Sequence, residues 1–219
     1  AGKITNWQEL GGADAPISAH LPVAGAGLAQ AVEDKLLSPA GLTLAKTIRR
    51  HDRGSTLVRT VATDPFSIGI ASFAETGQTR MLTLTGTCGF SLSAARRSIK
   101  TEDYPLTAPM FLYLPAHRLP RIARDFLTYV RGPAAQIVIR RAGFVDQAPE
   151  YIPMRMQGER LSNAIKSAGD DIPLGELKRM ISGLDGLQRL TTSFRFEAGS
   201  SRPDAQSRNN IDLIARELE

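Results

Sequence analysis

Cysteine is nearly absent from this chain, because Cys88 is the one such residue among 219. A lone cysteine excludes a disulfide within the chain, and it leaves the redox compartment undetermined. Cys88 stands in Thr87-Cys88-Gly89-Phe90, without a neighbouring cysteine or histidine that could share a metal. We therefore interpret it as a small, partly buried apolar side chain.

Aromatic residues make up only 6% of the sequence, which gives no indication of a surface for stacking nucleic-acid bases. Lys and Arg outnumber Asp and Glu by 27 to 22, for a net charge of +5. The basic residues come in scattered pairs and not in runs, namely Arg49-Arg50, Arg96-Arg97 and Arg140-Arg141. We predict solvated basic faces and no nucleic-acid partner, although the positive balance would favour a small anionic ligand.

Long apolar runs are missing too. No stretch of 18 apolar residues occurs, so we predict no membrane span. No signal peptide is visible, and the opening Ala1-Gly2-Lys3-Ile4-Thr5-Asn6-Trp7 is typical of the middle of a longer or trimmed chain.

Motifs for catalysis and for metal binding are also lacking. His20, His51 and His117 share no helical spacing, so we predict no metal site. No Gly-x-Ser-x-Gly elbow is present, and the glycines at 25–27 do not complete Gly-x-Gly-x-x-Gly. A Ser/His/Asp triad stays open, because such triads assemble in space and not in sequence. We predict no enzyme and no cofactor.

The order of expected elements indicates a mixed α/β fold. The first expected helix has one apolar face, made by Leu28, Val32 and Leu36. A second short helix is expected with Ser55 as its N-cap. A strand over 67–72 contains Gly69, which indicates a close backbone approach.

The second half of the sequence is expected to be richer in helix. The apolar run 109–114 predicts a buried strand, and 119–130 predicts a helix with an inner apolar face. The polar stretch 145–172 is a candidate boundary. Further elements are expected as helices over 134–142, 174–184 and 204–219, the last with Ile211, Ile214 and Leu218 inward, and as a strand over 192–197.

A tight turn formed by Gly25, Ala26, Gly27 and Leu28 opens a helix directly after an expected strand. Backbone N–H groups at such a place can bind an anion, although the turn could equally carry no ligand. The segment Arg50-His51-Asp52-Arg53-Gly54-Ser55-Thr56 also offers a guanidinium, a carboxylate and hydroxyls. We interpret this second segment as a charged surface loop, and Glu102-Asp103 as a turn.

Four segments together resemble the phosphate-binding protein family of ABC importers: Gly2-Lys3-Ile4-Thr5-Asn6-Trp7, Asp64-Pro65-Phe66-Ser67-Ile68-Gly69, Thr101-Glu102-Asp103-Tyr104-Pro105-Leu106 and Ala142-Gly143-Phe144-Val145-Asp146. The resemblance covers about residues 1–165. It implies a type 2 periplasmic-binding-protein fold whose two lobes are truncated here. Residues 1–104 would form most of the second lobe, and residues 105–150 would return to the first.

The C-terminal end resembles a different domain. Thr192-Ser193-Phe194-Arg195-Phe196-Glu197-Ala198-Gly199-Ser200 is similar to the opening strand of an OmpA-like domain, and residues 204–219 to its next helix. This implies a linker with a helix over 166–190 and the beginning of an OmpA-like domain over 191–219. Contact with peptidoglycan would need the missing part of that domain. The strand and helix would be disordered, packed on the rest, or paired with another chain.

The resemblance places the family's phosphate-gripping turn at Gly25, Ala26, Gly27 and Leu28, where only Gly27 is retained. Ala26 stands for a serine and Leu28 for a threonine, and Pro22 and Val23 occupy the region of the family's arginine and aspartate. We therefore expect a periplasmic binding component for phosphate or another small oxyanion, working with an ABC permease, whose ligand site is degenerate. The alternative is a structural or interaction scaffold in the cell envelope.

Overall fold

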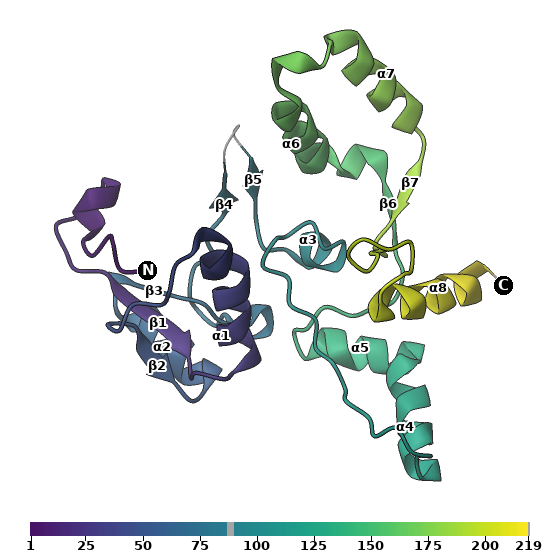
Figure 1. The fold of residues 1–219 in the computed structure, drawn as a ribbon, viewed down its shortest axis with the longest axis horizontal. Helices are drawn as coiled ribbons and strands as arrows, with labels where there is room; N and C mark the ends of the chain where they lie inside the picture. The colour runs from purple at the N-terminus through teal and green to yellow at the C-terminus, as the bar shows by residue number, and fades with distance from the viewer. Residues whose placement is uncertain (87–89, 219) are drawn as a thin grey trace. The chain divides into compact units, whose positions relative to one another are not determined.

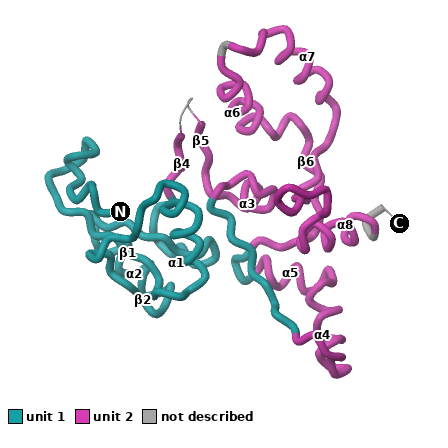
Figure 2. Tube along the Cα trace, viewed as in Figure 1, with its two compact units in different colours: residues 1–81, 106–114, 142–144 teal, residues 82–105, 115–141, 145–219 magenta. Residues whose placement is uncertain are grey.

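The computed structural model describes residues 1–86 and 90–218, without the side chains at 170 and 216–218. Cys88 lies outside these residues. The chain forms two compact units (Figure 2). Unit 1 comprises Ala1–Met81, Leu106–Leu114 and Ala142–Phe144, and unit 2 comprises Leu82–Pro105, Pro115–Arg141 and Val145–Glu219. The predicted domain boundaries at 165 and 190 stay predictions.

Unit 1 is built on a small parallel sheet in the order β2-β1-β3, formed by β1 (Ser18–Pro22), β2 (Arg49–His51) and β3 (Ser67–Gly69) (Figure 1). Helix α1 (Gly27–Val32) connects β1 to β2, and α2 (Gly54–Thr63) connects β2 to β3 on the far side of β1. Because these two crossovers run in opposite directions, right-handed connections place α1 and α2 on opposite faces of the sheet. The expected α/β architecture is confirmed.

The core of unit 1 comes from the inner faces of these elements, and its buried apolar residues include Ala15, Leu21, Ala29, Val32, Leu57 and Val58. Gly69 shows why a glycine is needed on β3, since a Cβ there would lie 3.0 Å from side-chain atoms of both Leu57 and Val61. The same Cβ would lie 3.3 Å from the His20 carbonyl oxygen, which confirms the close backbone approach predicted for Gly69.

The helix boundaries in unit 1 differ slightly from expectation. After α1, the chain continues as a π turn (Glu33–Leu37) and a 3-10 turn (Ser38–Ala40), and Gly41 ends it in the left-handed region at φ 63°. Leu36, expected on the apolar face, is 45% exposed, because the π turn rotates the chain away from the α1 face. The N-cap of α2 is Arg53 and not Ser55.

The N-terminal segment of unit 1 is fixed by side chains from its own motif. A short 3-10 helix (Trp7–Leu10) has a capping box, in which Asn6 accepts from the Gln8 N–H and Glu9 accepts from the Asn6 N–H. The Trp7 indole Nε1 donates to the Phe66 carbonyl at 2.8 Å. These bonds explain why Asn-Trp is useful here, since the asparagine caps the turn and the tryptophan anchors it to the residue before β3.

Unit 2 contains two short antiparallel strand pairs and most of the helices. Its paired strands are β4 (Leu84–Thr85) with β5 (Ser91–Leu92), and β6 (Tyr151–Pro153) with β7 (Gln188–Leu190), both antiparallel. Its helices are α3 (Arg96–Lys100), α4 (Arg121–Arg131), α5 (Pro133–Arg141), α6 (Gly158–Ala168), α7 (Leu174–Leu184) and α8 (Ala205–Leu218), with 3-10 turns at Phe73–Glu75 in unit 1 and at Met154–Met156 and Gly169–Asp171 in unit 2. Helix α7 has the predicted bounds, and α4 and α5 confirm helices close to those expected.

Two predicted apolar faces turn out to be exposed. The run expected as a buried strand has no strand partner among the described residues, and Met110, Phe111 and Tyr113 are 78%, 60% and 92% exposed. On α4, which has no buried residue, Ile122 and Phe126 are 80% and 54% exposed. Both predictions of burial are wrong here, because an apolar pattern creates a core only where another element covers it.

The C-terminal segment packs on the rest of unit 2, one of the three outcomes expected for it. The predicted strand over 192–197 is wrong, since only Phe196 pairs, in an isolated bridge with Pro203. Helix α8 is confirmed, and Asp204 caps it by accepting from the Ser207 N–H. Among its described side chains, Ser207 and Asn210 are buried, Ile214 is half-buried, and Ile211 is 46% exposed, so the inward placement of Ile211 is wrong. The side chain of Leu218 lies outside the described ones.

Candidate functional site

The predicted ligand turn lies at the carboxyl end of β1, the central strand of unit 1. Gly25 adopts the left-handed region at φ 86°, which a residue with a side chain rarely enters. Ala26 is the N-cap of α1, and its side chain makes no capping hydrogen bond. A Cβ added to Gly25 or Gly27 would meet no atom within 4 Å among the described residues, so the turn is open on that side.

A guanidinium reaches this turn from a neighbouring strand. Arg50, on β2, donates from Nη1 to the Pro22 carbonyl at 2.9 Å. The Val23 N–H donates to the His51 carbonyl at 3.0 Å, which extends the pairing of β1 and β2 into the turn. Glu33 lies 4.0 Å from the Arg50 guanidinium and partly offsets its charge. Arg50 belonged to the segment that the sequence interpretation set aside, so the contribution of this residue to the turn was missed.

Two histidines meet beside the same strands. His20 on β1 is 1% exposed, and its Nδ1 lies 2.8 Å from Nε2 of His51. Burial lowers the pKa of His20, and the nearby His51 and Arg49 lower it further. The buried His20 Nε2 has no hydrogen-bond partner among the described residues. The pair makes no hydrogen bond to a described serine or aspartate side chain, so the structure does not assemble a triad around it.

The start of α2, which the charged segment Arg50–Thr56 leads into, carries a carboxylate already. The Glu75 side chain lies so close to Gly54 that a Cβ added there would overlap its Oε2. A negative charge suits a helix N-terminus, and its presence disfavours a second anion at the same place. This supports the interpretation of the segment as a charged loop.

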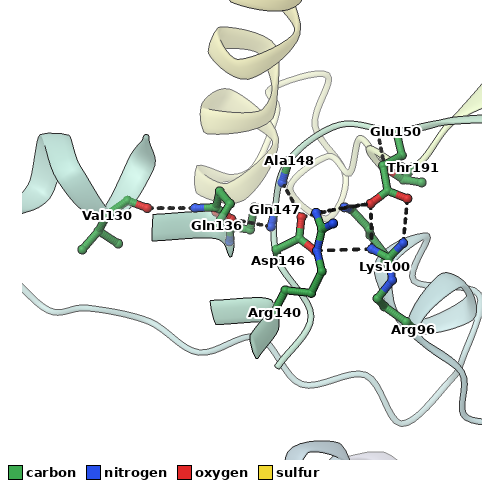
Figure 3. Close-up of polar contacts among 10 residues, drawn as sticks. All are labelled: Arg96, Lys100, Val130, Gln136, Arg140, Asp146, Gln147, Ala148, Glu150 and Thr191. Carbon is green, nitrogen blue, oxygen red and sulfur yellow. Dashed lines mark hydrogen bonds and ion pairs between the residues drawn. The ribbon is translucent and has the colours of Figure 1, made fainter. Parts of the chain in front are cut away.

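Unit 2 has its own polar centre, which the sequence did not reveal. The Asp146 side chain is fully buried, and its Oδ1 accepts from Lys100 Nζ at 2.8 Å while its Oδ2 accepts from Arg140 Nε at 3.0 Å (Figure 3). Glu150 accepts from both Arg96 and Lys100 at 2.6 Å. Three cations thus surround two carboxylates.

The charge states in this cluster follow from its hydrogen bonds. Burial by itself would raise the pKa of Asp146, but the hydrogen bonds from Arg140 and Lys100 outweigh it and hold the pKa at about 2. The hydrogen bond from Arg96 lowers the pKa of Glu150 to about 2. Both groups stay ionised at neutral pH and their oxygens are occupied by cations, which indicates a structural role.

The turn predicted at Glu102-Asp103 is confirmed, and its two carboxylates hold separate partners. Asp103 accepts from Arg189 at 2.6 Å and from Arg160 at 2.5 Å. Glu102, at φ 56°, pairs with Arg195 at 3.2 Å. The carboxylates therefore fasten later parts of unit 2 to the turn, and they do not form a catalytic pair.

Within the described parts of the chain, no helix is both long and apolar enough to cross a lipid bilayer. The same residues contain no group of three or more His, Cys, Asp or Glu side chains arranged to hold a metal ion.

Comparison with known proteins gives matches in structure only, since no protein-family profile and no curated sequence matches this chain. One match is a crystal structure from Clostridium perfringens, assigned as a phosphate ABC transporter substrate-binding protein with bound phosphate. It has a TM-score of 0.52 at 20% identity, and the alignment covers 66% of this chain and 58% of that one. An ABC-type phosphate transport receptor from Vibrio cholerae and PstS from Borrelia burgdorferi match over the same shares, with TM-scores of 0.45 and 0.42 at 17% and 15% identity.

The first of these likenesses shows the fold. About two thirds of the chain resembles part of a substrate-binding protein, which agrees with the fold that the sequence motifs implied. The chain spans 58% of the length of that protein. The start of an OmpA-like domain over 191–219 and the ligand turn at Gly25–Leu28 stay predictions.

Proposed function

We propose that this chain is part of a solute-binding protein of the envelope, whose ligand site is the open turn Gly25–Leu28 at the carboxyl end of β1. Ligands of open α/β sheets bind beyond the carboxyl ends of the strands, where the chain turns to opposite sides. The observation that carries the proposal is the turn itself, where a Cβ at Gly25 or Gly27 would meet no described atom within 4 Å. Arg50 adds a cation at Pro22, the last residue of β1 and three residues before the turn.

The proposed ligand is a small oxyanion, and phosphate binds weakly if at all. Ala26 and Leu28 have no hydroxyl to donate, and Glu33 competes for the Arg50 guanidinium. Each charge-assisted hydrogen bond contributes about 1.5–3 kcal/mol. The loss of three or four such bonds weakens binding by at least about three powers of ten. The site is therefore degenerate for phosphate, in line with the expectation from the sequence.

Calorimetric titration of the chain with phosphate and with sulfate tests this directly. We expect no phosphate binding in the micromolar range, and a dissociation constant at or below micromolar would contradict the degenerate site. Restoring hydroxyls by Ala26→Ser with Leu28→Thr should raise phosphate affinity by about tenfold per hydroxyl. The matched control is Ala40→Ser with Leu36→Thr, which adds the same groups at exposed positions outside the turn.

The second candidate function is a non-transport scaffold in which the turn holds no solute. The observation that favours it is the missing side-chain cap at Ala26, which removes the hydroxyl donor expected for an oxyanion. If the double variant gains no affinity over its control, the turn is not a working ligand site and the scaffold is preferred. A gain confined to the double variant supports solute binding.

Location in the periplasm and an ABC permease as partner follow from the same proposal, because substrate-binding proteins of this fold deliver their solute to a membrane transporter.

Residues 191–219 are proposed to begin an OmpA-like domain. Arg195 and Gln206 bond to Glu102 within this chain, so the segment has internal partners without peptidoglycan. Capture on purified peptidoglycan should therefore fail for this chain, and retention would show that residues of this chain make that contact.

A further inference from the structure

One helix of unit 2 exposes a stripe of large apolar side chains to solvent. Ile122, Phe126 and Tyr129 on α4 are 80%, 54% and 50% exposed. They follow the spacing i, i+4, i+7, and at about 100° per residue they lie within an arc of about 60°. Three such side chains on one stripe form a patch, and a patch indicates a contact surface where scattered exposed residues do not.

Helix α4 is a fixed part of unit 2. Among the described elements its chief contact is with α5, which follows it directly (Figure 1). The buried Gln136 of α5 donates to the Val130 carbonyl at 2.8 Å and accepts from the Gln147 N–H at 2.7 Å (Figure 3). Ala123, Leu127 and Val130 are half-buried and lie beside the exposed stripe. The stripe is therefore a second apolar face on a helix that is already attached.

The opposite side of α4 is basic. At the same helical spacing, Arg121, Arg124 and Arg131 lie within an arc of about 80°, and Arg118 stands just before the helix. All four are exposed. Asp125, the one acid in this segment, pairs with Arg121 at 3.6 Å. The other three arginines make no ion pair with any described residue.

An exposed apolar stripe on a basic helix matches the chemistry of a membrane surface with negative headgroups. Apolar side chains enter the boundary between headgroups and acyl chains, and a tyrosine such as Tyr129 is typical of that boundary. The long arginine side chains can bend toward the headgroups, and charges act over about 8 Å at physiological salt. We propose that α4 docks the protein on the surface of an anionic phospholipid bilayer, with its axis in the plane of that surface.

Two other occupants fit this face less well. A second copy of the chain would bring two arginine-rich helices together, and like charges oppose that contact. A protein partner would need a groove shaped to hold α4, whereas a fluid lipid surface adapts to a single amphipathic helix. The charge and the apolar stripe therefore favour lipid over protein.

Vesicle flotation tests the proposal. The whole chain is mixed with phosphatidylcholine vesicles that contain or lack phosphatidylglycerol, and the protein that floats with the lipid is measured. We expect binding to the vesicles with phosphatidylglycerol, little binding to those without it, and release at high salt. Equal binding to both kinds of vesicle would contradict the role of the arginines.

One pair of substitutions tests the apolar stripe. Ile122→Ser with Phe126→Ser removes most of the apolar stripe and leaves the charge unchanged. Serine has a helix propensity close to that of isoleucine and phenylalanine, so α4 should remain helical. Binding to the anionic vesicles should fall at least about tenfold. Leu187→Ser, at a position that is 54% exposed and outside α4, is the matched control and should bind like the parent chain.

A second pair of substitutions tests the charge. Arg118→Gln with Arg124→Gln should weaken binding to the anionic vesicles by about fivefold for each arginine at low salt. The matched control is Arg179→Gln with Arg202→Gln, which lowers the net charge by the same amount. Both control side chains are 78% exposed and lie outside α4, so this variant should bind like the parent chain.

Three results would overturn the proposal. The first is that the parent chain, with its folding verified by circular dichroism, does not bind anionic vesicles at low salt. The second is unchanged binding by the double serine variant. The third is a dimer in sedimentation velocity that the serine variant loses, found in place of lipid binding, since the stripe would then contact a second copy. All these variants lie in unit 2, so their failure leaves the proposed ligand turn in unit 1 untouched.

Discussion

Replacing Asp146 with asparagine would preserve the shape of the side chain and remove the charge that the buried cluster of unit 2 surrounds. Lys100 has only 4% of its side chain exposed, whereas Arg96 and Arg140 have 40% and 47%. Removing one partner of a buried ion pair costs about 3–5 kcal/mol. Glu150 still pairs with Lys100 and Arg96 in the variant, so we expect a loss near the lower end, about 3 kcal/mol.

The acid dependence gives an independent measure of the same group. The pKa of Asp146 falls from 3.8 to about 2 on folding, so the folded state binds the proton less readily than the unfolded state. Stability from this group is complete above pH 3.8 and is lost as pH falls toward 2. The shift corresponds to roughly 2 kcal/mol, because one pKa unit is about 1.4 kcal/mol.

The assay is urea unfolding followed by far-ultraviolet circular dichroism at pH 7 and at pH 3. Urea is preferred because guanidinium salts screen ion pairs. The matched control is Asp125→Asn, whose carboxylate is 69% exposed and pairs with Arg121 at 3.6 Å along α4, so its loss should stay below about 0.5 kcal/mol. The reasoning is refuted if Asp146→Asn unfolds with the parent midpoint at pH 7, or if its sensitivity to acid equals that of the parent.

Two further predictions concern single side chains. Because the pKa of His20 is lowered in the folded state, the unfolded chain binds a proton more readily, and unit 1 should lose stability as pH falls below 6.5. The variant His20→Phe should not show this loss. Urea unfolding at pH 7.5 and 5.5, followed by the fluorescence of Trp7, the one tryptophan, measures it. An equal loss in the variant would contradict the role of His20. Asn163→Ala removes both hydrogen bonds to the Ser91 backbone and should destabilise β5 by about 1–3 kcal/mol. Hydrogen exchange of the Ser91 backbone amide should become faster. Unchanged exchange would show that the Asn163 side chain does not stabilise the strand.

The sequence predicted the positions of helices and turns better than it predicted their caps and their buried faces. Helix α7 and the turn at Glu102-Asp103 depend on nearby residues and were found from them. The caps were harder, because Arg53 and not Ser55 precedes α2. The inward placement of Ile211 on α8 was wrong because Ser207 and Asn210 are the buried side chains, and they bond to backbone groups of the preceding segment. An apolar pattern cannot predict such polar contacts.

The candidate site was predictable only in part, for a related reason. The turn could be placed from its glycines. The hydrogen bond from Arg50 to the Pro22 carbonyl could not be predicted, because it depends on the pairing of β1 with β2. The Asp146 cluster joins residues up to 54 positions apart, and scattered charges look alike whether solvated or buried. The sole hint was Asp146 itself, at the end of a motif that the family resemblance had already marked.

The exposed run Met110–Leu114 has a consequence for handling the protein. Five consecutive apolar residues without a charge form the kind of segment that pairs with copies of itself in cross-β aggregates. Pro109 and Pro115 stand at its two ends, and neither has an N–H to donate. The two prolines limit any self-pairing to about five residues, so the aggregation-prone segment is flanked by residues that oppose the extension of a sheet.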